Sequence, residues 1–329
     1  MPPGTGILSM FAARGGAAAV VGVDGSAPIA AVARANVANN GLAAEAGGPV
    51  AIVSSRVEQL AALPLLGAGA ATGEQQQQQQ QQQVDVLVSE WMGYALFFES
   101  MLDSVLAARD RFLRPGGAVL PDAARVFLAP ATAGAVGTPF WDDVYGFAMP
   151  AVAEGVRSAA LREVLVHVVQ PEDVLGEGAC VASFDLATIA AADQDFTADF
   201  RLTASRGPAT CAALVLWFDT LFTERFCAEQ PVCLSTSPFG PPTHWGQAVL
   251  TLAAPVTMAP AVGLRAGGDG DAAAGSAESP AVALEGRISM ARSKHKHRSL
   301  DIALSYRAVG ADGRQGEEVS SIYAMGVNS

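Results

Sequence analysis

The chain has 329 residues, 50% of them hydrophobic, and a formal net charge of −12. This length suits two domains with sizeable cores. The acidity argues against a nucleic-acid-binding surface and favours a basic partner, although on charge alone solubility is the simpler explanation. The sequence lacks the run of roughly 20 apolar residues that spans a membrane, and its N-terminus lacks the basic flank and apolar core of a secretory signal.

The cysteines have neither the spacing of a redox pair nor that of a zinc site, and no histidine lies near them in the sequence to complete a ligand set. They are Cys180, Cys211, Cys227 and Cys233. We therefore expect reduced, mostly buried thiols in an intracellular protein, and no metal.

A short glycine pattern opens the chain. Gly4 and Gly6 precede the apolar stretch Ile7 to Ala13, which predicts a loop that approaches a ligand closely at the start of a helix. Such pairs are common in ordinary turns. Ser9 stands where a dinucleotide-binding pattern requires a third glycine, which disfavours NAD.

Alternating strands and helices are predicted next. Ala17 to Val23 is predicted as a buried strand that ends in Asp24, an acid suited either to ribose hydroxyls or to capping a turn. A helix is expected from Pro28 to Leu42 and a short strand from Ala51 to Ser54. Residues 67–83, rich in Gly, Ala and Gln, form a low-complexity insert, for which we expect a disordered surface loop or, as the alternative, weak self-association.

The segment from Ser89 to Ser100 is the most informative part of the chain: Ser-Glu-Trp-Met-Gly-Tyr-Ala-Leu-Phe-Phe-Glu-Ser. It follows a predicted strand, Val84 to Val88, and places Glu90 and Glu99 in an apolar, aromatic run. Two carboxylates that repel each other and are poorly solvated are costly to ionise unless a cation arrives. A guanidinium is a suitable ligand because its planar set of N–H donors matches the oxygens of carboxylates.

A helix with one apolar face is expected from Glu99 to Leu113, closed by Gly116 and Gly117. This helix supplies the structural alternative for Glu99, an acid in the first turn that is favoured by the helix dipole. The corresponding alternative for Glu90 is a strand-end acid paired with a local base.

Beyond about Arg125, short alternating segments separated by Pro, Gly and Asp clusters predict an antiparallel β domain. They are Val164–Val169, Phe196–Leu202, Ala212–Phe218, Gln247–Leu252, Val282–Met290 and Leu300–Tyr306. The aromatic cluster at 140–147 suits a core as well as an exposed arm, and residues 263–279 form a second loop insert. His167 is expected to be an ordinary sheet residue, and the basic run 292–298 a solvated hairpin tip.

The pattern Ser-Glu-x-Met-Gly…Glu-Ser-Met, present from Ser89 to Met101, resembles the double-glutamate loop of protein arginine N-methyltransferases. Thr243-His244-Trp245 is similar to the Thr-His-Trp loop of this family, and residues 140–147 resemble its type I members. The resemblance covers nearly the whole chain apart from the inserts.

The resemblance implies a fold and a division of the chain. Residues 1–124 would form a Rossmann-like, S-adenosylmethionine-dependent methyltransferase domain, and residues 125–329 an antiparallel β-barrel domain with a helical dimerisation arm at about 140–157. Pro2 and Pro3 stand where the family has glycine and cysteine, and the preceding strand and helices are missing. We therefore expect an N-terminally truncated chain with an incomplete first domain.

The resemblance also implies an activity, methyl transfer from S-adenosyl-L-methionine to guanidinium nitrogens of protein arginines, giving mono- and asymmetric dimethylarginine. Glu90, Glu99 and His244 would be catalytic, and no metal is needed. The residues implied to bind the cofactor are Gly4, Gly6, Asp24, Ser26, Val57, Glu58 and Met101.

The expected partners are arginine-rich proteins, with histones, ribosomal proteins and RNA-binding proteins as candidates, and a second copy of the chain. We expect no direct binding of nucleic acid or membrane, and a location in the cytoplasm, with the nucleus as a further site. Because part of the cofactor cradle is missing, the alternative is a catalytically impaired fragment that acts as a binding or scaffold protein.

Overall fold

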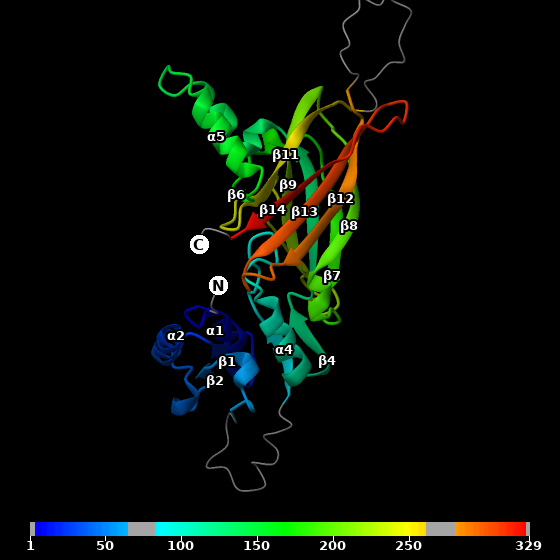
Figure 1. The fold of residues 1–329 in the computed structure, drawn as a ribbon. Helices are drawn as coiled ribbons and strands as arrows, with labels where there is room; N and C mark the ends of the chain where they lie inside the picture. Colours follow the sequence, from blue (N-terminus) through cyan, green and yellow to red (C-terminus); the bar gives the residue numbers. More distant parts are fainter. Residues whose placement is uncertain (1–3, 65–82, 261–279, 327–329) are drawn as a thin grey trace, which may run out of the picture.

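In the part of the chain that the structure describes, the strands form two small parallel sheets and two larger antiparallel sheets (Figure 1). The computed structural model describes residues 4–64, 83–260 and 280–326. The insert predicted at 263–279 lies outside these residues, and so does the insert at 67–83 apart from Gln83. Among the described helices, none combines the length and the apolar character needed to cross a bilayer.

The N-terminal part alternates helices and strands, as predicted, and its first two strands pair in parallel. Its elements are α1 (Ile7–Arg14), β1 (Val20–Asp24), α2 (Ala27–Asn39) and β2 (Val50–Ser54). The apolar stretch Ile7 to Ala13 is helical because Gly6, with φ 87°, turns the chain directly before it. Val37 of α2 and Val50 of β2 are buried against each other in a small core of their own.

A second parallel pair follows, formed by β3 (Val84–Val88) and β4 (Leu113–Leu120) around the helix α4 (Leu102–Phe112). Within the described residues the two parallel pairs are separate sheets, but a common apolar cluster joins them. Its buried members are Leu60, Leu63 and Phe112, and valines of β1, β2 and β3 pack against them.

The named strands of the C-terminal part all pair antiparallel. One sheet has the order β6-β11-β9-β5-β7 with β10 on β9, and the other has the order β14-β13-β12-β8. The bounds are β5 (Ala123–Ala131), β6 (Leu165–His167), β7 (Ala179–Asp185), β8 (Phe196–Leu202), β9 (Ala209–Phe222), β10 (Val232–Ser235), β11 (Gln247–Met258), β12 (Ala283–Arg292), β13 (Leu300–Val309) and β14 (Val319–Met325).

The two antiparallel sheets enclose one core. Leu216 and Leu250 of the first sheet are fully buried in the same cluster as Ile288 and Ile302 of the second. The sheets are also joined by hydrogen bonds, since the Tyr323 hydroxyl donates to a backbone carbonyl of β11 at 2.6 Å. The predicted fold, an α/β part followed by an antiparallel β domain, is therefore confirmed.

The region 138–160 projects from the sheets as an arm (Figure 1). It contains the short 3-10 helix η4 (Thr138–Asp142) and the helix α5 (Pro150–Ala160). Phe140, Tyr145 and Phe147 are 65%, 98% and 70% exposed. A role for this aromatic cluster in the core is therefore wrong, and the helical arm is confirmed.

Two further predictions need correction. The helix expected from Glu99 to Leu113 begins at Leu102 and ends at Phe112, and Gly116 and Gly117 lie inside β4. The helix stops early because Leu113 already pairs with β3. The cysteines are not mostly buried. Cys211 is buried and Cys227 is intermediate, whereas Cys180 on β7 and Cys233 on β10 are exposed at the edges of the first antiparallel sheet.

Candidate active site

The double-glutamate loop, residues 89–100, connects β3 to α4 through an unusual backbone path. Ala95, Leu96, Glu99 and Ser100 all have positive φ, between 49° and 78°. Left-handed backbone costs about 1–2 kcal/mol for a residue other than glycine, so the loop keeps this path only because its surroundings hold it. At Gly93 a side chain would collide with the Phe98 carbonyl, which explains the glycine of the motif.

Aromatic side chains anchor the loop in the core of the β domain. Trp91 and Phe97 are 1% and 2% exposed and stack with centroids 6.2 Å apart. Phe97 also meets Phe184 of β7 edge to face at 5.1 Å. The loop is therefore part of the rigid core, although it presents its acids at the surface of that core.

The carboxyl group of Glu90 is partly buried and has a raised pKa. Its Oε1 atom is buried and has no hydrogen-bond partner among the described residues. Desolvation raises the pKa of this carboxyl above 4.5, its ordinary value; the charge of Glu99 raises it further, and the nearby His244 lowers it. His244, a base, and the Met92 backbone both act on Glu90 and lower its pKa, so only the Oε1 atom lacks a partner in the described part of the chain. A buried polar atom without a partner requires an explanation, and in a pair of acids a ligand that completes the hydrogen bonding is one.

Glu99 lies close enough to Glu90 to influence its ionisation, so the structure brings the two acids together. Glu99 sits before α4 rather than in its first turn, and the helix-dipole alternative is therefore wrong. Its Oε1 atom forms an ion pair with Arg298 at 2.7 Å. Sequence reasoning missed this partner, because it treated the basic run 292–298 only as a solvated tip.

The Thr-His-Trp segment reaches the same loop from the β domain. The indole nitrogen of Trp245 donates to the Met92 carbonyl at 2.9 Å, and Trp245 is 8% exposed. His244 is exposed and its charge acts on Glu90. Of the three residues predicted as catalytic, Glu99 and His244 are therefore both near enough to Glu90 to act on its charge.

A second group of predicted residues surrounds the carboxyl end of β1. Gly4 and Gly6 have φ values of 67° and 87°. Asp24 is 5% exposed; its Oδ1 atom accepts from the Ser26 backbone N–H at 2.7 Å, while Oδ2 is buried without a partner among the described residues. A buried carboxylate oxygen with free acceptor capacity suits a ligand hydroxyl.

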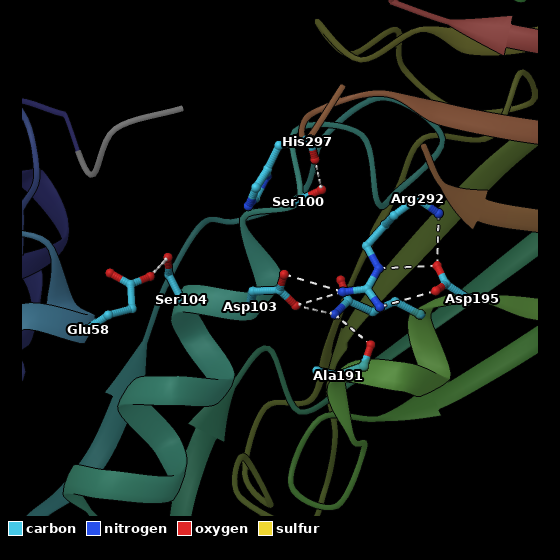
Figure 2. Close-up of polar contacts among 9 residues, drawn as sticks. Glu58, Ser100, Asp103, Ser104, Ala191, Asp195, Arg292 and His297 are labelled. Atoms are coloured by element: carbon cyan, nitrogen blue, oxygen red, sulfur yellow. Dashed lines mark hydrogen bonds and ion pairs between the residues drawn. The ribbon is translucent and has the colours of Figure 1, made fainter. Parts of the chain in front are cut away.

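Glu58 lies between the two groups. In the 3-10 helix η2 (Val57–Gln59), its carboxylate accepts from the Ser104 hydroxyl of α4 at 2.5 Å (Figure 2). This hydrogen bond lowers the pKa of Glu58. Met101, directly before α4, packs against the main core. The described contacts connect Glu58 to α4, and none joins Gly4, Gly6 or Ser26 to the two glutamates.

The fold and the acid pair define a class of protein, an α/β unit joined to an antiparallel β domain with a double-glutamate loop at the junction. Residues 122–311, more than half of the chain, match the family model of the arginine methyltransferase oligomerization subdomain. The chain therefore belongs to the protein arginine N-methyltransferase family.

Individual relatives agree with this assignment. The chain is similar to the probable protein arginine N-methyltransferase 3 of Arabidopsis thaliana, at 44% identity over 95% of this chain and 50% of the relative, and to that of rice (Oryza sativa subsp. indica), at 42% over the same shares. Among solved structures it is similar to the Trypanosoma brucei PRMT1 enzyme-prozyme heterotetrameric complex with AdoHcy, with 31% identity, a TM-score of 0.74, and coverage of 98% of this chain and 87% of that one. The chain spans about half the length of the curated relatives it matches.

Proposed function

We propose that this chain transfers a methyl group from S-adenosyl-L-methionine to a guanidinium nitrogen of protein arginines, giving mono- and then asymmetric dimethylarginine. The single observation that carries the proposal is the pair formed by Glu90 and Glu99, in which a buried carboxylate oxygen lacks a partner beside a second acid. Burial and the neighbouring charge of Glu99 disfavour the ionisation of Glu90. An arginine side chain is a planar cation whose geometry matches carboxylates.

The chemistry asked of these residues is alignment and electrostatics. An arginine is a poor nucleophile because its lone pairs are delocalised and its pKa exceeds about 12. Glu90 and Glu99 would bind two of its nitrogens and concentrate positive charge there, which leaves electron density on the third. Preorganised charge of this kind is usually the largest single contribution to catalysis, and holding the reactants in line supplies about 7–11 kcal/mol more. His244, which interacts electrostatically with Glu90, would help the departing proton to leave.

The first domain has features that suit the cofactor. The unpartnered Oδ2 atom of Asp24 can accept from a ribose hydroxyl, and Ser26 begins helix α2 beside it. Gly4 and Gly6 would let the backbone approach, Val57 and Glu58 would hold the adenine, and Met101 would shape the methyl-transfer site. When bound, the cofactor supplies an activated sulfonium methyl, so the chain needs no metal. Groups of three or more metal-binding side chains are absent from the described residues.

The same proposal extends to partners and location. The net charge of −12 favours arginine-rich proteins as substrates, with histones, ribosomal proteins and RNA-binding proteins as candidates. The exposed aromatic side chains of the arm suit self-association into a homodimer, and a structural neighbour is described as a heterotetramer. We propose a cytoplasmic location, with the nucleus as a further site that would permit histone methylation and effects on transcription.

One observation favours a second candidate function, a non-catalytic binding or scaffold protein. Within the described residues the parallel strands form two separate pairs, β1 with β2 and β3 with β4. A cofactor cradle that spans both pairs then depends on the apolar cluster around Leu60, Leu63 and Phe112 to keep its halves in place.

Calorimetric titration with S-adenosylhomocysteine, followed by methylation of an arginine-rich peptide, separates the two candidates. The proposed enzyme binds S-adenosylhomocysteine and methylates the peptide, and Glu90→Gln abolishes turnover while retaining the binding of S-adenosylhomocysteine. Folded protein that shows no heat of binding and no turnover would favour the scaffold. Turnover that survives in both Glu90→Gln and Glu99→Gln would exclude the proposed clamp.

A further inference from the structure

The hairpin tip between β12 and β13, residues 293–299, contacts the end of the double-glutamate loop three times. The backbone N–H of Glu99 donates to the Arg298 carbonyl at 2.9 Å. The Ser100 hydroxyl donates to the His297 carbonyl at 2.7 Å (Figure 2). The Arg298 guanidinium pairs with the Glu99 carboxylate at 2.7 Å. The hairpin tip is exposed to solvent, as predicted, but it is also bound to the candidate active site.

These contacts are made by Glu99 and Ser100, two residues of the loop whose backbone is in the unfavourable left-handed region. Glu99 and Ser100 have φ values of 78° and 54°, a conformation that other residues than glycine seldom adopt. Left alone, this part of the loop would relax and carry the Glu99 carboxylate away from Glu90. Both residues are instead bonded to the hairpin, which is nearly 200 residues away in the sequence.

The base of the hairpin is fixed to the helix that follows the loop. Arg292, the last residue of β12, contacts Asp195 at 3.1 Å and Asp103 of α4 at 3.2 Å (Figure 2). Gln194 donates to the same carboxylate of Asp103 at 2.7 Å. The segment 99–103 is therefore held at one end by the tip of the hairpin and at the other end by its base.

We propose that Arg298 is a positioning residue for the Glu99 carboxylate, and that the hairpin tip is an integral part of the substrate clamp. This inference rests on the proposed function, because it assigns Glu99 to the binding of the substrate guanidinium. Arg298 directs one oxygen of Glu99 and supplies a positive charge beside two acids that repel each other. Arginine suits this role better than lysine because its planar fork fixes direction as well as charge.

The opposite role for the same contact is competition with the substrate. A guanidinium bound to Glu99 also resembles the proposed substrate, so Arg298 would then compete with substrate rather than prepare the site. The two roles predict opposite effects of removing Arg298 on the reaction with the peptide. Removal of a positioning residue weakens catalysis, whereas removal of a competitor lowers the KM for the peptide.

The kinetic test compares Arg298→Ala, Arg298→Lys and Arg287→Ala in the full chain. Arg287 is the matched control, since it lies on β12, which leads into the hairpin, and forms an ion pair of 2.7 Å with Asp199 of the neighbouring strand β8, outside the site. We expect kcat/KM for an arginine-rich peptide to fall about 10- to 100-fold in Arg298→Ala, the loss that follows from misplacing a reacting group. Arg298→Lys should recover part of the loss, Arg287→Ala should match the wild type, and the binding of S-adenosylhomocysteine should be unchanged in all three.

Hydrogen exchange gives a second readout that needs no activity. In Arg298→Ala we expect the amides of residues 93–100 to exchange about tenfold faster or more, because the tethered loop opens locally, while Arg287→Ala leaves them unchanged. Unaltered exchange in Arg298→Ala, or a lowered KM for the peptide, would overturn the inference. A wild-type chain without turnover would instead count against the proposed function, and exchange would still decide whether Arg298 holds the loop.

Discussion

The indole N–H of Trp245 donates to the backbone carbonyl of Met92 at 2.9 Å, and this hydrogen bond joins two segments that are more than 150 residues apart. It connects the Thr-His-Trp segment of the β domain with the double-glutamate loop. The bond is buried and ties the segment that carries His244 to the loop that carries the acids. The site therefore depends on the junction between the two parts of the chain.

Replacing Trp245 by phenylalanine should destabilise the protein by about 1–3 kcal/mol, since the Met92 carbonyl would be left buried without its donor. Urea denaturation measures this loss as a lower midpoint. Trp91→Phe is the matched control: it makes the same change of ring in the double-glutamate loop that Trp245 contacts, but the indole nitrogen of Trp91 has no hydrogen-bond partner among the described residues. Equal losses in the two variants would show that ring size, rather than the hydrogen bond, determines the effect.

Glu90→Gln should raise the melting temperature at pH 7 while abolishing methyl transfer. Desolvation and the charge of Glu99 raise the pKa of Glu90 in the folded state, so its ionisation costs stability at every pH above that raised value. The advantage of the variant should vanish as the pH falls below 4.5, the ordinary glutamate value, where the wild-type carboxyl is protonated in both states. Melting curves at several pH values follow this difference.

Glu99→Gln provides the contrast to that result, because it breaks the ion pair with Arg298. We expect no gain in melting temperature for this variant, although it should also lose activity. If Glu99→Gln were stabilised as much as Glu90→Gln, the cost of ionisation would not belong to Glu90 in particular, and its assignment to the burial of that carboxyl would be wrong.

Arg292→Ala should lower the free energy of unfolding by about 1–2 kcal/mol, because Asp103 and Asp195 would lose a charged hydrogen-bond donor that is only partly exposed. Chemical denaturation checks this value. Arg287→Ala serves as the control, since the pair of Arg287 with Asp199 is fully exposed and should contribute less. A larger loss in the control would contradict the importance assigned to the base of the hairpin.

The arm should be needed for self-association but not for folding. Tyr145→Ser and Phe147→Ser remove side chains that are already 98% and 70% exposed, so we expect little change in melting temperature and a shift from dimer to monomer in sedimentation velocity. Ile322→Ser, on β14, is the control because this residue is equally apolar and 73% exposed. Loss of the dimer in the control, or its retention in both arm variants, would count against the arm.

Much of the fold could be predicted because its signals are local. Phe196 to Leu202 has the alternation of a half-buried strand, and the structure forms β8 over those residues. The start of α4 could not be predicted this way, because Glu99 and Ser100 adopt left-handed backbone held by residues 297 and 298. Helix periodicity carries no information about a tertiary contact of that kind.

In the candidate site, too, some residues could be predicted from a local motif and others could not. The motif from Ser89 to Met101 marked Glu90 and Glu99, and the structure brings them together. Arg298 was missed, because a basic run at a hairpin looks the same whether it faces water or an acid. A run of basic residues is therefore worth comparing with every unpaired carboxylate elsewhere in such a chain.

The left-handed backbone of the double-glutamate loop has a practical consequence for protein engineering. A designer who grafts residues 89–100 onto another scaffold would transfer the acids without the supports that shape them. A working transplant needs three pieces together: the loop, the Trp245 anchor and the β12–β13 hairpin tip.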